Sequence, residues 1–233
     1  MKKLMIGGLA AALLYTAVPT LTVKRLPLGT YRKGGVPGTI ALTFDDGPHP
    51  LYTPRLLDLL KQHEVKATFF VVGEKAVRFP ELLRRIHEEG HEIAVHHYTH
   101  VSNWLLSPAG YRRQLEDSIR VISGITGVPP RYYRPPWGHL TPLTLLYSKK
   151  LGIVLWSSTA KDWKRGTTEK ELFSRLKKAD PDGGIILLHD SGDTFGADSE
   201  GPARLIPALA RFIPEMKSEG VRFVPIPELL QNR

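Results

Sequence analysis

Cysteine is absent from the 233 residues of this chain. Its absence excludes a disulfide framework, thiolate metal sites and thiol nucleophiles. Histidine, aspartate and glutamate are left as the candidate ligands for any metal ion. A chain without cysteine also suits export by a cell that does not rely on disulfides.

The chain also lacks the patterns that are typical of proteins that bind nucleotides or nucleic acids. No glycine-rich phosphate fingerprint follows any apolar run, which counts against a nucleotide-binding sheet. The 32 lysines and arginines exceed the 23 aspartates and glutamates and give a formal charge of +9, but they are scattered singly and in pairs. We therefore expect no nucleic-acid partner. The charge fits either a generic basic surface or one suited to an anionic cell envelope.

The amino terminus differs in character from the rest of the chain. Lys2 and Lys3 precede an apolar run over residues 4–18, which matches the first two regions of an export signal. Pro19 makes a poor cleavage site, and the apolar stretch read through residue 23 approaches the ~20 residues needed to span a bilayer. Residues 1–23 are thus predicted to be a signal peptide or a membrane anchor, with a buried helix as the alternative. Either of the first two predicts an exported protein, secreted or membrane-anchored in the cell envelope.

After a polar, glycine-rich stretch over residues 24–37, interpreted as a linker, residues 38–233 are predicted to form one domain. Short apolar runs alternate there with helical patterns, which predicts a parallel α/β sheet with right-handed crossovers. The runs are continuously apolar, as expected for a sheet covered on both faces. A (β/α) barrel and an open doubly wound sheet both fit this pattern. The predicted strands are residues 39–44, 67–72, 92–95, 153–156, 185–188 and 222–224.

Helix starts are marked clearly in the sequence. Thr53 and Ser107 each precede a proline, which predicts a capping hydroxyl followed by proline at the first helical position. Thr168 and Glu171 have the spacing of a capping box.

Two carboxylates and two imidazoles follow two of the predicted strands. Asp45 and Asp46 come directly after the run 39–44, and His96 and His100 come after the run 92–95. If the strands are parallel, these side chains emerge at one edge of the sheet. One carboxylate with two imidazoles predicts a divalent metal site that keeps an open position, as catalytic sites do. The other carboxylate is then free to act as a base on water that the metal activates.

Further polar residues also lie where predicted strands end. Arg134 closes a short Tyr-Tyr run, Asp162 and Trp163 follow the run 153–156, and His189 follows the run 185–188. This is the edge at which parallel α/β folds build their functional sites. We therefore expect all of these residues to contribute to one site.

At these residues the chain resembles a known family. Its motifs are TFDDG at 43–47, HHYTH at 96–100, RPPWG at 134–138, DW at 162–163 and LLH at 187–189. In this order they are similar to those of the polysaccharide deacetylase family, also called carbohydrate esterase family four or the NodB homology domain. The resemblance covers roughly residues 38–230. It implies a distorted (β/α) barrel as a single domain, and metal-dependent removal of N-acetyl groups from an amino-sugar polymer such as peptidoglycan or a chitin-like glycan.

The resemblance also implies roles for individual residues. Asp46, His96 and His100 would hold one divalent ion, zinc first and cobalt or a similar ion second. Asp45 would be the general base, with Arg134 as its charge partner.

The remaining roles concern the acid and the walls of the pocket. His189 would be the general acid, and Leu187 and Trp163 would wall the acetyl pocket. The backbone N–H near Trp137 would help the metal to receive the oxyanion, because the two prolines before it have no N–H. The partner that these roles imply is the N-acetylated glycan, and no protein partner is implied.

The chain departs from the family pattern at two positions. His97 stands where the family usually has serine or threonine, and it would either hydrogen-bond the loop backbone or act as a fourth ligand. Thr159 replaces the first aspartate of the family's Asp-x-x-Asp-Trp motif, which is thought to orient the acid histidine and raise its pKa. Asp162 or Asp190 would then support His189. These departures motivate two alternatives: a catalytically silent glycan-binding protein, and an esterase that removes O-acetyl groups and tolerates a weaker acid.

Overall fold

The computed structural model describes residues 7, 12–26, 29–148 and 150–231. Its strands are β1 Thr30–Tyr31, β2 Thr39–Asp45, β3 Thr68–Val71, β4 Glu92–Val95, β5 Tyr132–Tyr133, β6 Gly152–Val154, β7 Ser158–Thr159, β8 Asp182–His189 and β9 Arg222–Phe223. Its helices are α2 Ala17–Arg25, α3 Tyr52–Gln62, α4 Gly73–Arg78, α5 Pro80–Glu88, α6 Pro108–Thr126, α7 Pro142–Tyr147, α8 Glu169–Leu176, α9 Gly201–Ser218 and α10 Ile226–Leu229. Two 3-10 turns, η1 Asn103–Leu105 and η2 Pro136–Gly138, complete the described elements.

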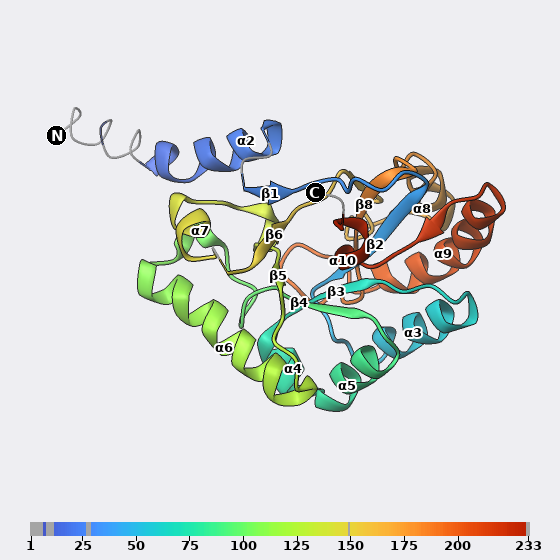
Figure 1. Ribbon diagram of the computed structural model, residues 1–233, viewed down its shortest axis with the longest axis horizontal. Coiled ribbons are helices and arrows are strands. Elements are labelled where there is room, and N and C mark those ends of the chain that lie inside the picture. The colour runs from blue at the N-terminus through green and yellow to red at the C-terminus, as the bar shows by residue number, and fades with distance from the viewer. Residues whose placement is uncertain (1–6, 8–11, 27–28, 149, 232–233) are drawn as a thin grey trace.

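The strands form one parallel sheet in the order β1-β6-β5-β4-β3-β2-β8-β7, with β9 pairing to β2. The sheet curls into a half-barrel, and helices α3 to α6, α8 and α9 surround its outer side (Figure 1). The two ends of the described sheet, β1 and β7, do not pair with each other. The predicted distorted (β/α) barrel is therefore confirmed, in the form of a curled and open sheet.

Strand β2 shows how both faces of the sheet are covered. Successive residues of a strand point to opposite faces. Leu42 and Phe44 belong to the apolar layer beneath the helices, whereas Ala41 belongs to a smaller cluster inside the curl. By the same alternation Thr43 and Asp45 face the inside, where Asp45 is the last residue of the strand. The continuous apolar run therefore ends in a carboxylate that faces the mouth of the half-barrel.

The opposite end of the half-barrel is closed by α10. Ile226 and Leu229 of this helix are fully buried in the inner cluster together with Phe70. The backbone N–H of Ile226 donates to Thr68 Oγ1 at 2.9 Å, which places α10 at the start of β3. The interior is thus filled at the amino ends of the strands and is accessible at their carboxyl ends.

Most of the local predictions agree with the structure. All six predicted runs contain a strand, and the Ser107 cap and the Thr168 capping box are confirmed. The predicted cap at Thr53 is wrong, because α3 begins one residue earlier at Tyr52. The Thr53 hydroxyl donates instead to Asp190 Oδ2 at 2.5 Å. A buried carboxylate needs a hydrogen-bond donor. The Thr53 hydroxyl serves Asp190 in this way and does not cap the helix.

The range 24–37, interpreted as a linker, also contributes to the sheet. Within it, β1 pairs with β6 through Thr30 and Tyr31, and Gly34 N–H donates to Gly183 O at 2.7 Å. A strand of two residues has no alternating pattern that the sequence could reveal. The boundary between residues 37 and 38 stays a prediction.

The amino-terminal prediction falls only partly on described residues, because residues 1–6 and 8–11 lie outside them. Helix α2 contacts the domain through Thr20, whose hydroxyl accepts from Trp104 Nε1 at 3.2 Å and from Leu140 N at 2.9 Å. Within the described residues, no helix combines the length and the apolar character required to cross a membrane.

The helix-covered face of the sheet generates a prediction about stability. Leu188 is a residue of β8 whose side chain is fully buried beneath the surrounding helices. Leu188→Ala therefore removes apolar contacts and leaves a cavity. We expect the free energy of unfolding to fall by about 2–5 kcal/mol, measured by urea denaturation. Val77→Ala, at an exposed position of α4, serves as the control and should change it by less than about 0.5 kcal/mol. Equal effects of the two substitutions would contradict this packing.

Candidate active site

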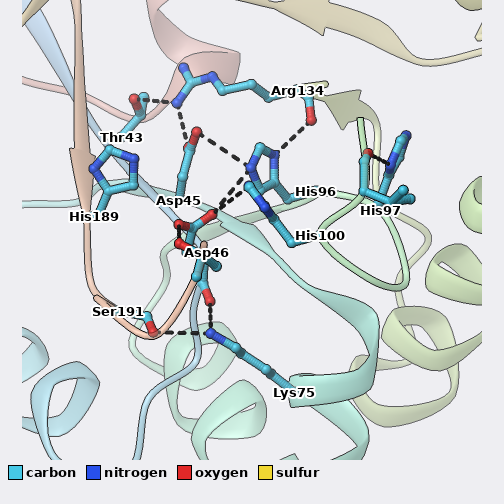
Figure 2. A network of polar contacts seen from close by, with 12 residues as sticks. Thr43, Asp45, Asp46, Lys75, His96, His97, His100, Arg134, His189 and Ser191 are labelled. Atoms are coloured by element: carbon cyan, nitrogen blue, oxygen red, sulfur yellow. Dashed lines mark hydrogen bonds and ion pairs between the residues drawn. The ribbon is translucent and has the colours of Figure 1, made fainter. Parts of the chain in front are cut away.

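Three side chains that could hold a metal ion meet at the mouth of the half-barrel. Asp46 follows β2, and His96 and His100 follow β4, which lies two strands away across β3. Asp46 Oδ1 lies 3.3 Å from His96 Nε2 and 3.2 Å from His100 Nε2 (Figure 2). One ligand atom from each of the three residues lies within 4.8 Å of the others. The parallel register brings the strand ends together, as the spacing of these residues predicts.

The chemistry of this cluster fits a divalent cation. Asp46 Oδ1 is buried without a hydrogen-bond partner, which is costly unless a positive charge compensates it. His96 Nδ1 donates to the Arg134 carbonyl at 2.7 Å, which orients the ring so that Nε2 faces Asp46 and is the nitrogen available to a metal ion. Burial raises the pKa of Asp46, but the neighbouring histidines outweigh burial and hold the pKa well below its usual value. An ionised carboxylate and two imidazoles are a donor set suited to zinc or a similar ion.

The second oxygen of the candidate ligand Asp46 is held by a residue that the sequence did not indicate. Thr194 Oγ1 donates to Asp46 Oδ2 at 2.6 Å, so the hydroxyl orients the carboxylate and leaves Oδ1 facing the histidines. Lys75 Nζ donates to the backbone carbonyl of Asp46 at 2.7 Å and to Ser191 Oγ at 3.0 Å, and it pairs with Asp193. The backbone of Asp46 has a φ of 75°, an unfavourable value for a residue with a Cβ. Lys75 thus helps to hold a strained turn in place.

The predicted base, Asp45, is paired with a fully buried arginine. Arg134 Nη1 lies 2.6 Å from Asp45 Oδ1 and donates to Thr43 Oγ1 at 2.8 Å. Its other nitrogens donate to the carbonyls of Val154 at 3.1 Å and Leu155 at 3.0 Å. The hydrogen bond from the guanidinium goes to Asp45 Oδ1, and Asp45 Oδ2 lies 3.9 Å from His96 Nε2. The free oxygen therefore faces the candidate metal ligands.

His189 lies on the other side of the two aspartates from His96 and His100 (Figure 2). Asp162 Oδ1 is 3.2 Å from His189 Nδ1, and Asp162 Oδ2 accepts from the backbone N–H of His189 at 2.7 Å. Burial lowers the pKa of His189, but the carboxylates around it, Asp162 foremost, outweigh burial and raise the pKa to about 9. A carboxylate therefore stands behind His189 although position 159 is threonine. Thr159 Oγ1 accepts from Lys161 N instead.

His97 is separate from the candidate metal ligands, although it is adjacent to His96. It points away from Asp46 (Figure 2), with Nδ1 3.0 Å from the Val101 carbonyl and Nε2 2.6 Å from the Tyr133 hydroxyl. Burial lowers the pKa of His97 to about 3, so the ring is neutral. Of the two alternatives drawn from the sequence, His97 makes the hydrogen bond to the loop backbone.

An open cavity of about 290 Å³ joins these groups. The predicted wall residues Trp163 and Leu187 line it, and so does Trp137, whose backbone N–H was predicted to face the oxyanion. The Trp137 ring packs edge-on against His100 with 4.2 Å between the ring centroids, and the Trp163 ring meets His189 in the same way at 5.3 Å. The other lining residues are Asp45, Asp46, His96, His100, Gly138, Trp156, His189, Thr194, Phe195, Gly196 and Ala197.

Several of these lining residues escaped the sequence analysis. Thr194 and Phe195 lie in the loop between β8 and α9, residues 190–200, which shows no apolar period or motif. The sequence predicts Trp156 as the end of a strand, but β6 stops at Val154 and Trp156 lines the cavity. Lys75, which helps to hold the turn at Asp46, was also missed, because a single lysine in a helix is usually solvated and does not indicate a structural role.

Comparisons with known proteins agree with the motifs. A sequence profile described as polysaccharide deacetylase matches residues 32–156. A peptidoglycan-N-acetylglucosamine deacetylase of Bacillus cereus is 38% identical over 206 residues, which cover 88% of this chain and 71% of the relative. A chitooligosaccharide deacetylase of Bradyrhizobium is 38% identical over 88% of this chain and 98% of the relative.

Solved structures are similar to this chain over most of its length. The Bc1960 peptidoglycan N-acetylglucosamine deacetylase superposes with a TM-score of 0.78 at 35% identity, covering 88% of this chain and 94% of that one. A family 4 acetyl xylan esterase from Clostridium thermocellum, in complex with a cobalt ion, gives 0.73 at 36% identity, covering 82% and 89%. BA3943 of Bacillus anthracis, a pseudoenzyme, gives 0.75 at 29% identity, covering 86% and 68%.

The bond between Thr194 and Asp46 generates a prediction about metal affinity. Thr194→Val removes the hydroxyl that orients the carboxylate and keeps the shape of the side chain. We expect the affinity for Zn²⁺ or Co²⁺ to fall about tenfold, measured by competition with a chromophoric chelator. Thr194→Ser retains the hydroxyl and should retain the affinity. An unchanged dissociation constant in the T194V protein would show that the bond has no part in holding Asp46.

Proposed function

The chain belongs to the polysaccharide deacetylase family, and on that premise we propose that it is a metal-dependent hydrolase that removes N-acetyl groups from an amino-sugar polymer. The observation that carries the proposal is the meeting of three groups around one cavity: the Asp46 cluster, the Asp45–Arg134 pair and the Asp162–His189 pair. These are the ligand set, the base and the acid that amide hydrolysis requires. Relatives that share most of the chain are peptidoglycan and chitooligosaccharide deacetylases.

Asp46, His96 and His100 would hold the ion. When bound there, a divalent ion supplies a Lewis acid that polarises the acetyl carbonyl and acidifies water. Zinc is the first candidate and cobalt the second, since imidazole and carboxylate ligands suit both.

Asp45 accepts the proton of the attacking water. Arg134 fixes the carboxylate through Oδ1, which leaves Oδ2 free on the side of the cavity. Because the guanidinium is fully buried and bonded to the carbonyls of Val154 and Leu155, it keeps its position while Asp45 gains a proton.

His189 protonates the leaving nitrogen from the opposite side. Water adds to the acetyl carbon, the carbon–nitrogen bond breaks, acetate leaves, and the sugar retains an amine that carries the proton from His189. With its pKa raised to about 9, the imidazole is protonated at neutral pH and ready to donate. Leu187, Trp163 and Trp156 give the cavity an apolar wall suited to the acetyl methyl group.

The contact between Asp162 and His189 favours this function over the two alternatives. Both alternatives were motivated by the loss of an acidic partner at position 159, and the silent protein also by the altered loop at His97. Asp162 supplies that partner, so His189 carries a proton at neutral pH and can give it to an amine leaving group. The acetyl xylan esterase among the structural relatives makes O-acetyl substrates a necessary arm of the test.

The proposal extends to the place of action, outside the cytoplasmic membrane. Its support is the apolar run over residues 4–18 after Lys2 and Lys3, which suits a signal peptide or an anchor, together with the formal charge of +9. An N-acetylated glycan of the cell envelope is the partner that this location would provide.

Acetate release tests the proposed activity. The purified protein is loaded with Zn²⁺ or Co²⁺, its metal content is measured, and it is assayed on N-acetylglucosamine oligomers, peptidoglycan and acetylated xylan. We expect release from the N-acetylated glycans, and loss of release in the Asp46→Asn variant. Metal-loaded protein that releases acetate only from xylan would identify an esterase. Protein that releases none from any substrate would indicate a silent relative.

The Asp162–His189 pair generates a prediction about pH dependence. A general acid must be protonated, so the rate falls as pH rises through the pKa of His189. Asp162→Asn removes the charge that raises this pKa, and the alkaline limb of the kcat/KM profile should move to lower pH, with a loss of rate of up to about 100-fold. Thr159→Ala is the matched control and should leave the limb in place, because Thr159 Oγ1 bonds Lys161 N. A limb that stays fixed in the D162N protein would contradict the role of Asp162.

A further inference from the structure

A tight turn presents one aromatic ring at the rim of the cavity. The backbone N–H of Ala197 donates to the carbonyl of Thr194 at 3.0 Å, which closes a four-residue turn with Phe195 at its second position. Gly196, at the third position, has a φ of 87°, which is the left-handed value that some β-turns require there. Phe195 therefore lies at the corner of a β-turn, and Gly196 supplies the left-handed backbone conformation that this turn requires.

The turn is fastened on both sides. Before Phe195, Thr194 donates to Asp46, and Asp193 pairs with the buried Lys75. After it, Asp198 N–H donates to the Trp163 carbonyl at 3.0 Å. These contacts hold the turn against the candidate metal ligands and the wall of the cavity, so its position relative to the reacting groups is defined.

Phe195 is exposed despite this anchoring. It is 91% exposed, the largest fraction among the exposed large apolar side chains of the described residues. It lines the same cavity as Asp46 and His100, together with Trp137, which is 40% exposed. Phe195 and Trp137 together expose apolar surface around a polar site, and such grouped apolar surface is typical of ligand-binding sites.

The size of the cavity limits how much of a polymer it takes. At about 290 Å³ it lies just below the ~300–1,000 Å³ typical of small-molecule sites. It suits one sugar with its acetyl group, and the next sugar of a chain then lies over the rim. The C–H faces of a pyranose ring are apolar, and an aromatic ring covers such a face while the hydroxyl groups remain in water.

We propose that Phe195 is a specificity-determining residue that packs against the sugar unit next to the one being deacetylated. The inference rests on the proposed function and adds a preference for oligomers over the single sugar. We expect the neighbouring sugar to make this contact equally in the bound substrate and in the transition state, so that the contact lowers KM and leaves kcat nearly unchanged. Trp137, at the same cavity, packs on His100 and is thereby tied to the metal-ligand side of the mouth.

The experiment compares the parent, Phe195→Ala and Phe195→Trp on N-acetylglucosamine and on its tetramer. For the tetramer we expect the alanine variant to raise KM about three- to tenfold with kcat nearly unchanged, and the tryptophan variant to restore KM. For the single sugar the three proteins should have the same kcat/KM. Inhibition by the fully deacetylated tetramer, which is not turned over, should weaken in F195A by the same factor as KM rises.

Val77→Ala, which changes an exposed apolar residue of α4 away from the cavity, is the control for a general surface effect. An F195A protein that matches the parent on the tetramer in KM and in inhibition overturns the inference while the activity stands. An equal loss of kcat/KM on the single sugar and on the tetramer would also overturn the inference, because Phe195 would then contact the reacting sugar. A parent that deacetylates neither substrate overturns the proposed function, and the inference falls with it.

Discussion

The site depends on one buried cation, the guanidinium of Arg134. It spans the curl of the sheet by bonding Thr43 and Asp45 of β2 and the carbonyls of Val154 and Leu155 at the end of β6. The backbone carbonyl of the same residue accepts from His96, so one position fixes both the candidate base and a candidate ligand. A charge buried to this degree is tolerated only when its hydrogen bonds are satisfied and a counter-charge is present. The arginine therefore fixes the distance between the two halves of the mouth.

The sequence predicted the parts of this structure that depend on local pattern. Apolar runs marked the central strands, and the spacing of His96 and His100 marked ligands on one loop. The sequence did not predict contacts between distant segments. Thr194 donates to Asp46 across 148 residues, and no pattern near either residue indicates this hydrogen bond. The short strands β1 and β7 were missed because neither lies within an apolar run that the sequence marks.

Position 159 shows why a single substitution is hard to interpret from a motif. From the sequence, threonine there removes the usual acidic partner of His189 and leaves Asp162, Asp190 or a weaker acid as the alternatives. In the folded chain Asp162, three residues on, contacts both the ring and the backbone N–H of His189. Lys161 has a φ of 55°, so the backbone turns sharply just before Asp162. What matters is the geometry of this turn, which residue letters alone do not describe.

The closed end of the half-barrel has a consequence for how a polymer is handled. Because α10 fills the interior at the amino ends of the strands, a long chain cannot thread through the molecule and can only lie across the mouth. Nothing in that arrangement requires a free chain terminus. An enzyme with this shape has room to modify units in the middle of a glycan strand as well as at its ends.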